Sequence, residues 1–311
     1  ADHFSIRPAA PGDMRRLLAA ALPLDQPPCR GIVHLWSLDI GAPGSATVHS
    51  LEASQAVGCG SVLDLIQALP VTNGRQPPRL WLVTQGAQRV ADEAASLAMA
   101  QAPLWGFGRA LAVEHRELWG ALVDLDPADS PSAAASLLWQ AMNSPDGEDQ
   151  CAFRNGRRHD ARLARRPRPT PPRGKSPWRS DGSYLITGGL GDLGLLVARW
   201  MVEQGARRLI LLARTPLPAR SDWHEVKSGS RLAEQIGAIR ELEAMGASVH
   251  RASVDVADEA QLGSFLETYR REAWPPIRGV IHAAGVVENR TILEMDADAL
   301  KAVLRPKVAG G

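Results

Sequence analysis

Cysteines are few and scattered in this 311-residue chain. The three that occur, Cys29, Cys59 and Cys151, form no Cys-x-x-Cys pair and have no histidine cluster near them in the sequence. This spacing argues against a disulfide framework and gives no zinc-binding pattern, so we expect no bound metal. We expect instead reduced, buried thiols, as in a cytoplasmic protein.

Long apolar runs and an excess of one charge are also missing. No run approaches the roughly 20 apolar residues that span a bilayer, and residues 1–10 lack the charged-then-apolar pattern of a signal peptide. The 35 lysines and arginines nearly balance the 34 aspartates and glutamates, so no broad positive field exists for nucleic acid or a membrane surface. We therefore expect a cytoplasmic protein with no transmembrane segment and no nucleic-acid partner.

Several catalytic signatures are absent from the sequence as well. It contains no Gly-x-Ser-x-Gly, no Gly-Lys-Ser/Thr phosphate loop and no His-Glu-x-x-His, so hydrolase, kinase and metalloenzyme functions find no support. The residues that are present include 45% hydrophobic ones, enough to build real cores. The length is typical of about two domains.

A proline-rich, basic segment from Ala164 to Lys175 divides the chain. It has almost no apolar side chains and cannot continue a helix or a central strand. We interpret residues 166–182 as a connector between two domains, residues 1–165 and 183–311. A solvated linker and a binding tail for an acidic partner are both compatible with its composition.

The C-terminal domain alternates between strand-like and helical patterns. Strands are predicted at Ser183–Thr187, Arg208–Ala213, Ser248–Val256 and Arg278–Ala283, and helices at Leu193–Gln204, Leu232–Met245 and Glu259–Ala273. Buried, β-branched strands between amphipathic helices indicate an α/β fold with a doubly wound parallel sheet.

The N-terminal domain has a similar rhythm. Strands are predicted at Gly31–Leu38, Arg79–Thr84 and Ala121–Leu125, and helices at Leu51–Leu69 and Pro131–Met142. No glycine fingerprint follows any of these strands. We therefore expect two Rossmann-like doubly wound parallel-sheet subdomains, of which the first is degenerate and structural and only the second binds a nucleotide.

That second domain carries a glycine-rich turn between its first strand and first helix. The turn consists of Thr187, Gly188, Gly189, Leu190, Gly191, Asp192, Leu193 and Gly194. We expect Gly189 to permit a tight turn, Gly191 to let phosphates approach the backbone, and Gly194 to let the helix pack closely on the strand. The first N–H groups of the helix would then face a dinucleotide pyrophosphate. The alternative is a plain strand-to-helix turn.

The ends of the other strands supply further candidate cofactor contacts. After the second strand, Arg214 and Thr215 suit the 2′-phosphate of NADP, where an acidic residue would suit NAD. After the third, Asp255 is positioned to accept from the adenine amino group and Val256 to pack on the base, although Asp255 is equally a turn former. After the fourth, the small residues at 283–285 leave room for the nicotinamide, namely Ala283, Ala284 and Gly285. We expect His282 to be a packed core histidine.

Taken together, these segments resemble the ketoreductase domain of a type I polyketide synthase, a relative of the short-chain dehydrogenases/reductases. The resemblance is carried by Tyr184–Gly194, Leu211–Arg214, Val254–Val256 and Ile277–Gly285, and in the first domain by Ala102–His115 and Leu122–Asp126. It implies transfer of a hydride from NADPH to the β-keto group of an acyl chain on an acyl carrier protein, alongside other domains of the same synthase. The matching segment Leu304–Gly310 assigns Lys307 as the catalytic lysine that holds the nicotinamide ribose.

Two departures from the family pattern leave alternatives open. The chain ends at Gly311, before the segment that would supply the serine, tyrosine and asparagine, so we expect a truncated fragment that is inactive by itself. A non-catalytic structural or docking domain of the same megasynthase is the alternative; a stand-alone short-chain reductase is disfavoured because no Tyr-x-x-x-Lys occurs. In addition, Val287-Glu288-Asn289 replaces the Leu-Asp-Asp of one stereochemical class, which leaves the configuration of the product open.

Overall fold

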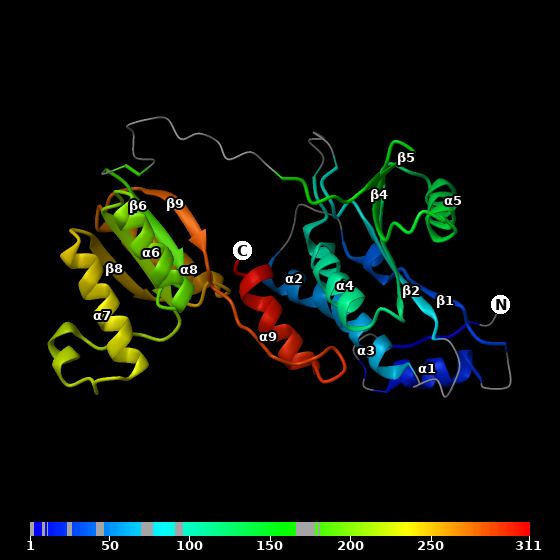
Figure 1. Cartoon of the computed structure of the whole chain (residues 1–311), viewed down its shortest axis with the longest axis horizontal. Helices are drawn as coiled ribbons and strands as arrows, with labels where there is room; N and C mark the ends of the chain where they lie inside the picture. Colours follow the sequence, from blue (N-terminus) through cyan, green and yellow to red (C-terminus); the bar gives the residue numbers. More distant parts are fainter. Residues whose placement is uncertain are drawn as a thin grey trace. The chain divides into compact units, whose positions relative to one another are not determined.

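A computed structural model describes residues 3–7, 10, 12–23, 27–41, 47–69, 77–90, 96–165, 178–179 and 181–311 (Figure 1). The chain divides into two compact units. The first comprises Ala1–Arg166 and Glu288–Lys301, and the second comprises Pro167–Val287 and Ala302–Gly311. Most of the predicted connector, residues 166–177 and 180, lies outside the described residues.

The first unit is built on a five-stranded sheet whose spatial order follows the chain. Four strands run parallel, as the sequence pattern predicts, and the fifth is an antiparallel edge strand. The strands are β1 (Gly31–His34), β2 (Arg79–Gln85), β3 (Trp119–Leu125), β4 (Gln150–Arg154) and β5 (Arg157–Asp160). The antiparallel pair turns at Asn155 and Gly156, whose φ angles of 52° and 70° are those of a tight hairpin.

The helices of the first unit are α1 (Asp13–Ala21), α2 (Val48–Gln55), α3 (Ser61–Ala68), α4 (Pro103–Glu114) and α5 (Pro131–Met142). Ser130 caps α5, accepting the N–H of Ala133 at 3.4 Å. The prediction of one helix over Leu51–Leu69 is wrong in detail, because a π-helical turn at Ala56–Gly60 separates α2 from α3. The predicted strand Gly31–Leu38 is also shorter, since a 3₁₀ turn begins at Trp36.

Helices cover both faces of this sheet. Val123 and Leu122, neighbours in β3, point to opposite sides. Val123 belongs to the buried cluster that includes Ala134 of α5, whereas Leu122 packs against Gly108 of α4. Helix α4, which follows β2, and helix α5, which follows β3, therefore lie on opposite faces of the sheet.

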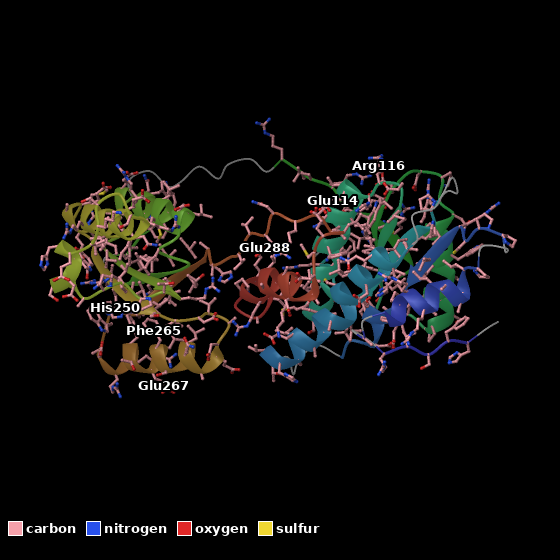
Figure 2. All side chains as sticks on the ribbon, turned by 90° about the horizontal axis from the view of Figure 1, so that it is seen from below. Glu114, Arg116, His250, Phe265, Glu267 and Glu288 are labelled. Atoms are coloured by element: carbon pink, nitrogen blue, oxygen red, sulfur yellow. The ribbon has the colours of Figure 1, made fainter. Side chains whose placement is uncertain are left out.

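The segment Glu288–Lys301 packs within the first unit although the sequence on both sides of it belongs to the second. The carboxylate of Glu114, labelled in Figure 2, accepts the N–H of Ile292 at 2.7 Å. The side-chain amide of Gln67 donates to the carbonyls of Ile292 and Met295 at 2.9 and 2.6 Å. Lys301 Nζ lies 3.2 Å from a carboxylate oxygen of Glu52. Sequence reasoning placed this segment in the second domain alone.

The second unit contains a four-stranded parallel sheet in the order β8-β7-β6-β9. Its strands are β6 (Ser183–Thr187), β7 (Arg208–Ala213), β8 (Ser248–Ser253) and β9 (Ile277–His282). Strand β8 ends three residues earlier than predicted. In chain order the arrangement is third, second, first, fourth, which is the Rossmann pattern. The strand order reverses between β6 and β9.

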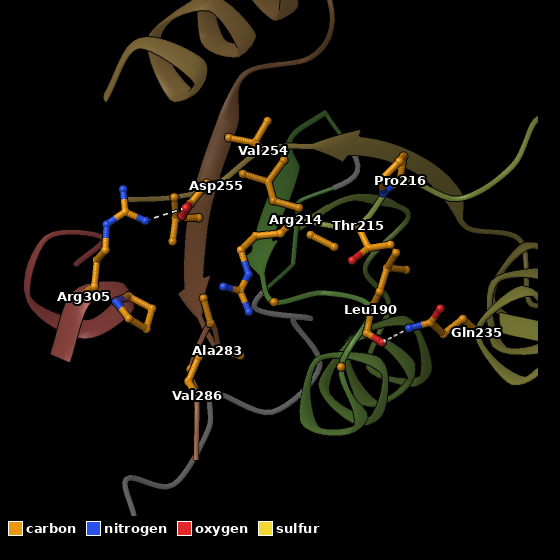
Figure 3. Close-up of a pocket in the computed structure, with 18 of the residues that line it drawn as sticks. Leu190, Arg214, Thr215, Pro216, Gln235, Val254, Asp255, Ala283, Val286 and Arg305 are labelled. Atoms are coloured by element: carbon orange, nitrogen blue, oxygen red, sulfur yellow. Dashed lines mark hydrogen bonds and ion pairs between the residues drawn. The ribbon is translucent and has the colours of Figure 1, made fainter. Parts of the chain in front are cut away.

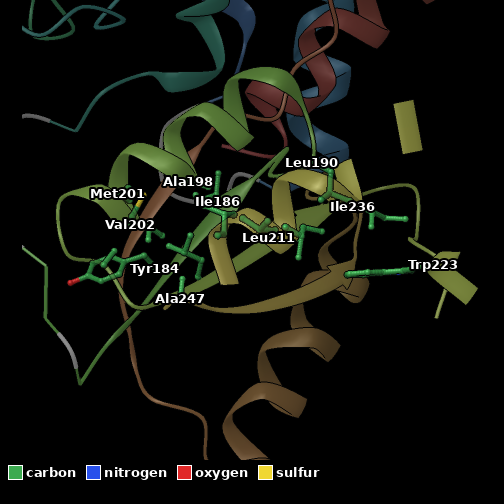
Figure 4. Close-up of a cluster of buried hydrophobic side chains, with 14 residues drawn as sticks. Tyr184, Ile186, Leu190, Ala198, Met201, Val202, Leu211, Trp223, Ile236 and Ala247 are labelled. Carbon is green, nitrogen blue, oxygen red and sulfur yellow. The ribbon is translucent and has the colours of Figure 1, made fainter. Parts of the chain in front are cut away.

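Helices α6 (Asp192–Glu203) and α7 (Arg231–Ala244) cover one face of this sheet, and α8 (Glu259–Arg271) covers the other. Figure 4 shows the first of these cores, where Ile186 and Leu211 meet Met201 and Ile236. Leu185 and Ile210 point the opposite way, toward Tyr269 of α8. Asp258 caps α8, and its carboxylate accepts the N–H of Gln261 at 3.0 Å. A further helix, α9 (Ala297–Val308), begins in the first unit and ends in the second.

In the described part of the chain, no helix is both long and apolar enough to cross a membrane. Within the same residues, no group of three or more His, Cys, Asp and Glu side chains is arranged to hold a metal ion.

Cys59 and Cys151 are buried free thiols, and burial raises the pKa of Cys59 to about 12. Cys29 is only half-buried, so the expectation of a buried thiol is wrong there.

Candidate functional site

A cavity of about 560 Å³ lies at the carboxyl ends of the strands of the second unit, where the order reverses between β6 and β9 (Figure 3). This is where open α/β sheets bind ligands. Ten of the predicted cofactor residues line it, namely Gly188, Leu190, Gly191, Arg214, Thr215, Asp255, Val256, Ala283, Ala284 and Gly285.

The glycine turn forms one wall of the cavity. Gly188 has a φ of +64°, and a β-carbon there would stand 2.8 Å from the carbonyl oxygen of Ala283. The prediction that Gly189 makes the tight turn is wrong by one residue, since the left-handed conformation belongs to Gly188. Gly189 instead lies against Leu211 of β7, where a β-carbon would come within 2.8 Å. Both glycines are required, each for a different contact.

Helix α6 begins directly behind this turn, and its first N–H groups have no side-chain cap. The N-cap position is Gly191, which has no side chain to accept a hydrogen bond. A β-carbon on Gly194 would collide with the carbonyl oxygen of Gly188, so the predicted close packing of the helix is confirmed. An uncapped helix N-terminus that faces a cavity is suited to an anion.

Arg214 and Thr215 are exposed residues at the end of β7 and line the cavity. In Figure 3, the guanidinium of Arg214 reaches between Leu190 and Ala283. A second cation, Arg231 at the start of α7, also lines the cavity and lies 3.1 Å from the carboxylate of Asp192. The site thus has cations near both the glycine turn and the end of β7, as a phosphorylated ligand requires.

Asp255, predicted to receive the adenine amino group, already has protein partners for both carboxylate oxygens. Arg305 donates to one at 2.6 Å and the N–H of Ala257 to the other at 3.0 Å. Burial tends to raise the pKa of Asp255, but the hydrogen bonds from Ala257 and Arg305 and the charges of Arg305 and Arg214 outweigh it. The pKa therefore lies below its usual value, and the carboxylate stays ionised.

Lys307, in the last turn of α9, lies beside the loop that follows β9. Its Nζ lies 2.9 Å from the point where a β-carbon on Gly285 would stand. The hydroxyl oxygen of Thr187 accepts the N–H of Ala284 at 3.2 Å, which joins β6 to the same loop. The structure thus places Lys307 beside Gly285, which lines the cavity, although Lys307 is not one of the lining residues itself.

The remaining predicted residues do not line the cavity. Thr187, Gly189 and Gly194 support the turn from behind. Leu193 is 63% exposed, and Asp192, whose side chain is 85% exposed, lies beside Arg231. His282 was expected in the core but is exposed, and its ring contacts Thr187 and the backbone of Pro306.

Sequence reasoning missed three polar residues that line the cavity: Arg231, Gln235 and Arg305. The side chain of Gln235 donates to the carbonyl of Leu190 at 2.8 Å and so steadies the glycine turn. Arg305 stands two residues before Lys307 in the segment that carries the family resemblance, which is a signal that was available. Arg231 and Gln235 follow a long loop, and no local sequence pattern identifies them as residues that line the cavity.

The strand order of the first unit does not reverse, and the strand ends there carry a buried polar network of the protein itself. At the ends of β2 and β3, Asp124 accepts hydrogen bonds from the hydroxyl of Thr84 at 2.6 Å and from the N–H groups of Ala87 and Gln88 at 2.9 and 3.1 Å. Arg154 completes the network. These contacts serve the packing of the first unit.

The residues of the second unit fit a dinucleotide. Gly188 and Gly191 of the turn line the cavity without side chains, the N-terminus of α6 is uncapped, and Arg214 and Arg231 supply positive charge. Neither of the two tyrosines of the chain lines the cavity. Tyr184 accepts the N–H of Arg179, and Tyr269 donates to Ser183 or Pro275, so both have structural partners.

Comparison with known families agrees with this geometry. The profile described as "Polyketide synthase extender module SpnB, Rossmann fold domain" matches residues 8–163, and that described as "KR domain" matches residues 182–311. The chain belongs to the ketoreductase domains of type I polyketide synthases. The resemblance stated from the sequence is thereby confirmed, as is the α/β fold with Rossmann-like parallel sheets.

Relatives of this ketoreductase domain are found in much longer proteins. It is 37% identical over 252 residues to a phenolphthiocerol/phthiocerol polyketide synthase of Mycobacterium tuberculosis, covering 81% of this chain and 13% of that protein. It is 34% identical over 271 residues to 6-methylsalicylic acid synthase of Aspergillus terreus, covering 85% and 14%. The chain therefore spans about an eighth of the curated relatives it matches.

Solved structures give the same assignment. The structure of an A1-type ketoreductase is 29% identical, with a TM-score of 0.77, and the match covers 99% of this chain and 59% of that one. A multidomain structure from a keto acid-selecting NRPS module aligns with a TM-score of 0.80 at 23% identity, which shows the fold alone. Ketoreductase domains are Rossmann-fold reductases that use a nicotinamide cofactor, and this ketoreductase domain has the cavity for one.

Proposed function

We propose that this chain is the cofactor-binding part of a β-ketoacyl reductase that uses NADPH and acts on an acyl chain tethered to an acyl carrier protein. The observation that carries the proposal is the uncapped N-terminus of α6 behind Gly188, with Arg214 at the end of β7 and Lys307 beside Gly285. When bound, NADPH supplies the hydride.

Each end of the cavity has a separate role in this proposal. The turn at Gly188–Gly191 and the first N–H groups of α6 hold the pyrophosphate. Arg214 and Thr215 hold the 2′-phosphate, which NADH lacks, and so select NADPH. Asp255 and Val256 lie beside the adenine, where Asp255 remains ionised through Arg305.

Lys307 acts beside Gly285, which lines the cavity. Its ammonium donates to the hydroxyls of the nicotinamide ribose, while Ala283, Ala284 and Gly285 leave space for the ring. A lysine in this place also favours ionisation of a neighbouring tyrosine by its positive charge.

The chain covers 59% of a solved ketoreductase, and we propose that the serine, tyrosine and asparagine belong to a longer polypeptide that contains it.

Two measurements test the proposal. Calorimetric titration of the chain with NADPH and NADH should show tighter binding of NADPH; binding of neither would contradict a cofactor site. Oxidation of NADPH should then be followed in a polypeptide that joins these residues to the remainder of a ketoreductase domain, with a β-ketoacyl pantetheine thioester as substrate. Lys307→Ala should lower turnover in that assay. A domain that binds NADPH without oxidising it would instead be the non-catalytic docking domain.

A further inference from the structure

His282 connects two elements that border the cavity. Its Nδ1 lies 2.8 Å from the hydroxyl oxygen of Thr187, at the end of β6. Its Nε2 lies 2.8 Å from the carbonyl oxygen of Pro306, in the last turn of α9. One exposed imidazole therefore joins the strand before the glycine turn to the helix that carries Lys307.

The chemistry of the partners determines which atom donates in each bond. A carbonyl oxygen only accepts, so Nε2 of His282 must carry the hydrogen and donate to Pro306. In the neutral ring Nδ1 is then the acceptor, and the hydroxyl of Thr187 donates to it. The oxygen of Thr187 still accepts the N–H of Ala284 at 3.2 Å. The chain of hydrogen bonds thus runs in one direction, from Ala284 through Thr187 and His282 to Pro306.

The carbonyl of Pro306 needs a partner from outside the helix. The last carbonyls of an α-helix have no intrahelical donor. At this end of α9, the N–H groups of both Ala309 and Gly310 point to the carbonyl of Arg305, at 3.0 and 3.2 Å. His282 therefore caps the carbonyl that immediately precedes Lys307, while Arg305 on the other side is held by Asp255.

We propose that His282 is a positioning residue, which fixes the backbone of α9 at Pro306 and thereby holds Lys307 Nζ over Gly285. The inference rests on the proposed function, because it assigns His282 a task only if Lys307 serves the cofactor. Without the cap, the last turn of α9 loses one of its two tethers, and Lys307 takes on the freedom of a surface lysine.

The lysines of the chain make a direct test possible. There are only four, Lys175, Lys227, Lys301 and Lys307, so reductive methylation with isotope-labelled formaldehyde gives few NMR signals. Lys307→Arg identifies the signal of Lys307, and exposed Lys227 provides a reference for a free side chain. We expect the wild-type Lys307 signal to differ from that of Lys227 and to move when NADP⁺ is added.

Three variants of His282 separate capping from general stability. His282→Phe keeps the ring without its nitrogens, and should move the Lys307 signal to the position of Lys227. His282→Gln, whose amide reaches Pro306, should keep the wild-type signal, whereas the shorter His282→Asn should lose it. His224→Phe is the matched control, because His224 is a surface histidine of the same unit with a side chain 75% exposed. It should change nothing.

The outcomes distinguish the two proposals. An unchanged Lys307 signal in folded His282→Phe and His282→Asn would overturn the positioning role, even if NADP⁺ still moves the signal. If His282→Phe does not fold, the contrast between Gln and Asn decides the question. A wild-type Lys307 signal that does not move when NADP⁺ is added would contradict the proposed function. The Lys307 signals of the His282 variants without NADP⁺ would still test the positioning role of His282.

Discussion

The guanidinium of Arg154 lies 2.6 Å from the carboxylate of Asp124, and both side chains are almost inaccessible to water, with exposed fractions of 7% and 0%. The pair stands at the carboxyl ends of β3 and β4. The first unit therefore neutralises the buried carboxylate of Asp124 with a cation of its own.

Removal of one member of this pair should destabilise the first unit strongly. Asp124→Ala removes a carboxylate partner of the buried Arg154, and such changes lower the free energy of unfolding by about 3–5 kcal/mol. Urea unfolding measures the loss. Asp146→Ala, which breaks the exposed pair with Arg158, is the control and should cost far less. Equal effects of the two changes would show that the buried network is not structural.

Arg214 should determine the preference between cofactors. In Arg214→Ser, we expect the Kd for NADPH to rise roughly 10- to 100-fold, the equivalent of one or two charge-assisted hydrogen bonds. The Kd for NADH should change little, because NADH has no 2′-phosphate. Calorimetric titration of both cofactors gives the comparison. Arg199→Ser, outside the cavity on α6, should leave both constants unchanged. An equal loss of affinity for NADH would contradict the proposed contact of Arg214 with the 2′-phosphate.

Two helical glycines should respond in opposite directions to the same change. Gly194→Ala places a methyl group against the carbonyl of Gly188 and should lower stability by about 1–3 kcal/mol, with weaker NADPH binding. Gly237→Ala lies in α7 with nothing within 4 Å, and should raise stability by roughly 0.5–1 kcal/mol. Thermal unfolding and NADPH titration of both variants check this. A Gly194→Ala protein as stable as Gly237→Ala would contradict the close packing of α6.

The ion pair between Asp255 and Arg305 should appear in the acid titration. Because the pKa of Asp255 is lowered in the folded protein, its contribution to stability is complete above the unfolded value of about 3.9. It is lost as the pH falls from there through the folded pKa. In Arg305→Met, the pKa of Asp255, followed by the NMR shift of its carboxyl carbon, should rise, and stability should fall less steeply with acid. An unchanged pKa would show that the N–H of Ala257 and the charge of Arg214 hold the pKa down without Arg305.

Much of the second unit could be predicted from the sequence because its signals are local. Strand β7 is predicted to the residue, since its whole run Arg208–Ala213 is apolar apart from the first position. Helix α8 starts where Asp258 predicts it. Such features depend on periodicity and capping within a few neighbouring residues.

Several of the features that were missed depend on contacts distant in sequence. The pairing of Asp255 with Arg305 joins residues fifty positions apart, and no local pattern reports it. The close approach of Ala283 to Gly188 likewise joins residues far apart in the chain. Other features were missed although a local signal was present: Arg305 stands in the segment that carries the family resemblance, and Asn155-Gly156 signals the β4–β5 hairpin.

The division of the chain into units has a practical consequence for exchanging domains between synthases. The polypeptide crosses from one unit to the other three times, after residues 166, 287 and 301. A single cut in the connector leaves two covalent crossings intact. A protein started at Ser183 would carry residues 288–301 away from Gln67 and Glu114, which bind that segment. The smallest piece that can be transplanted without unpaired surfaces is therefore the two units together, from before α1 to beyond α9.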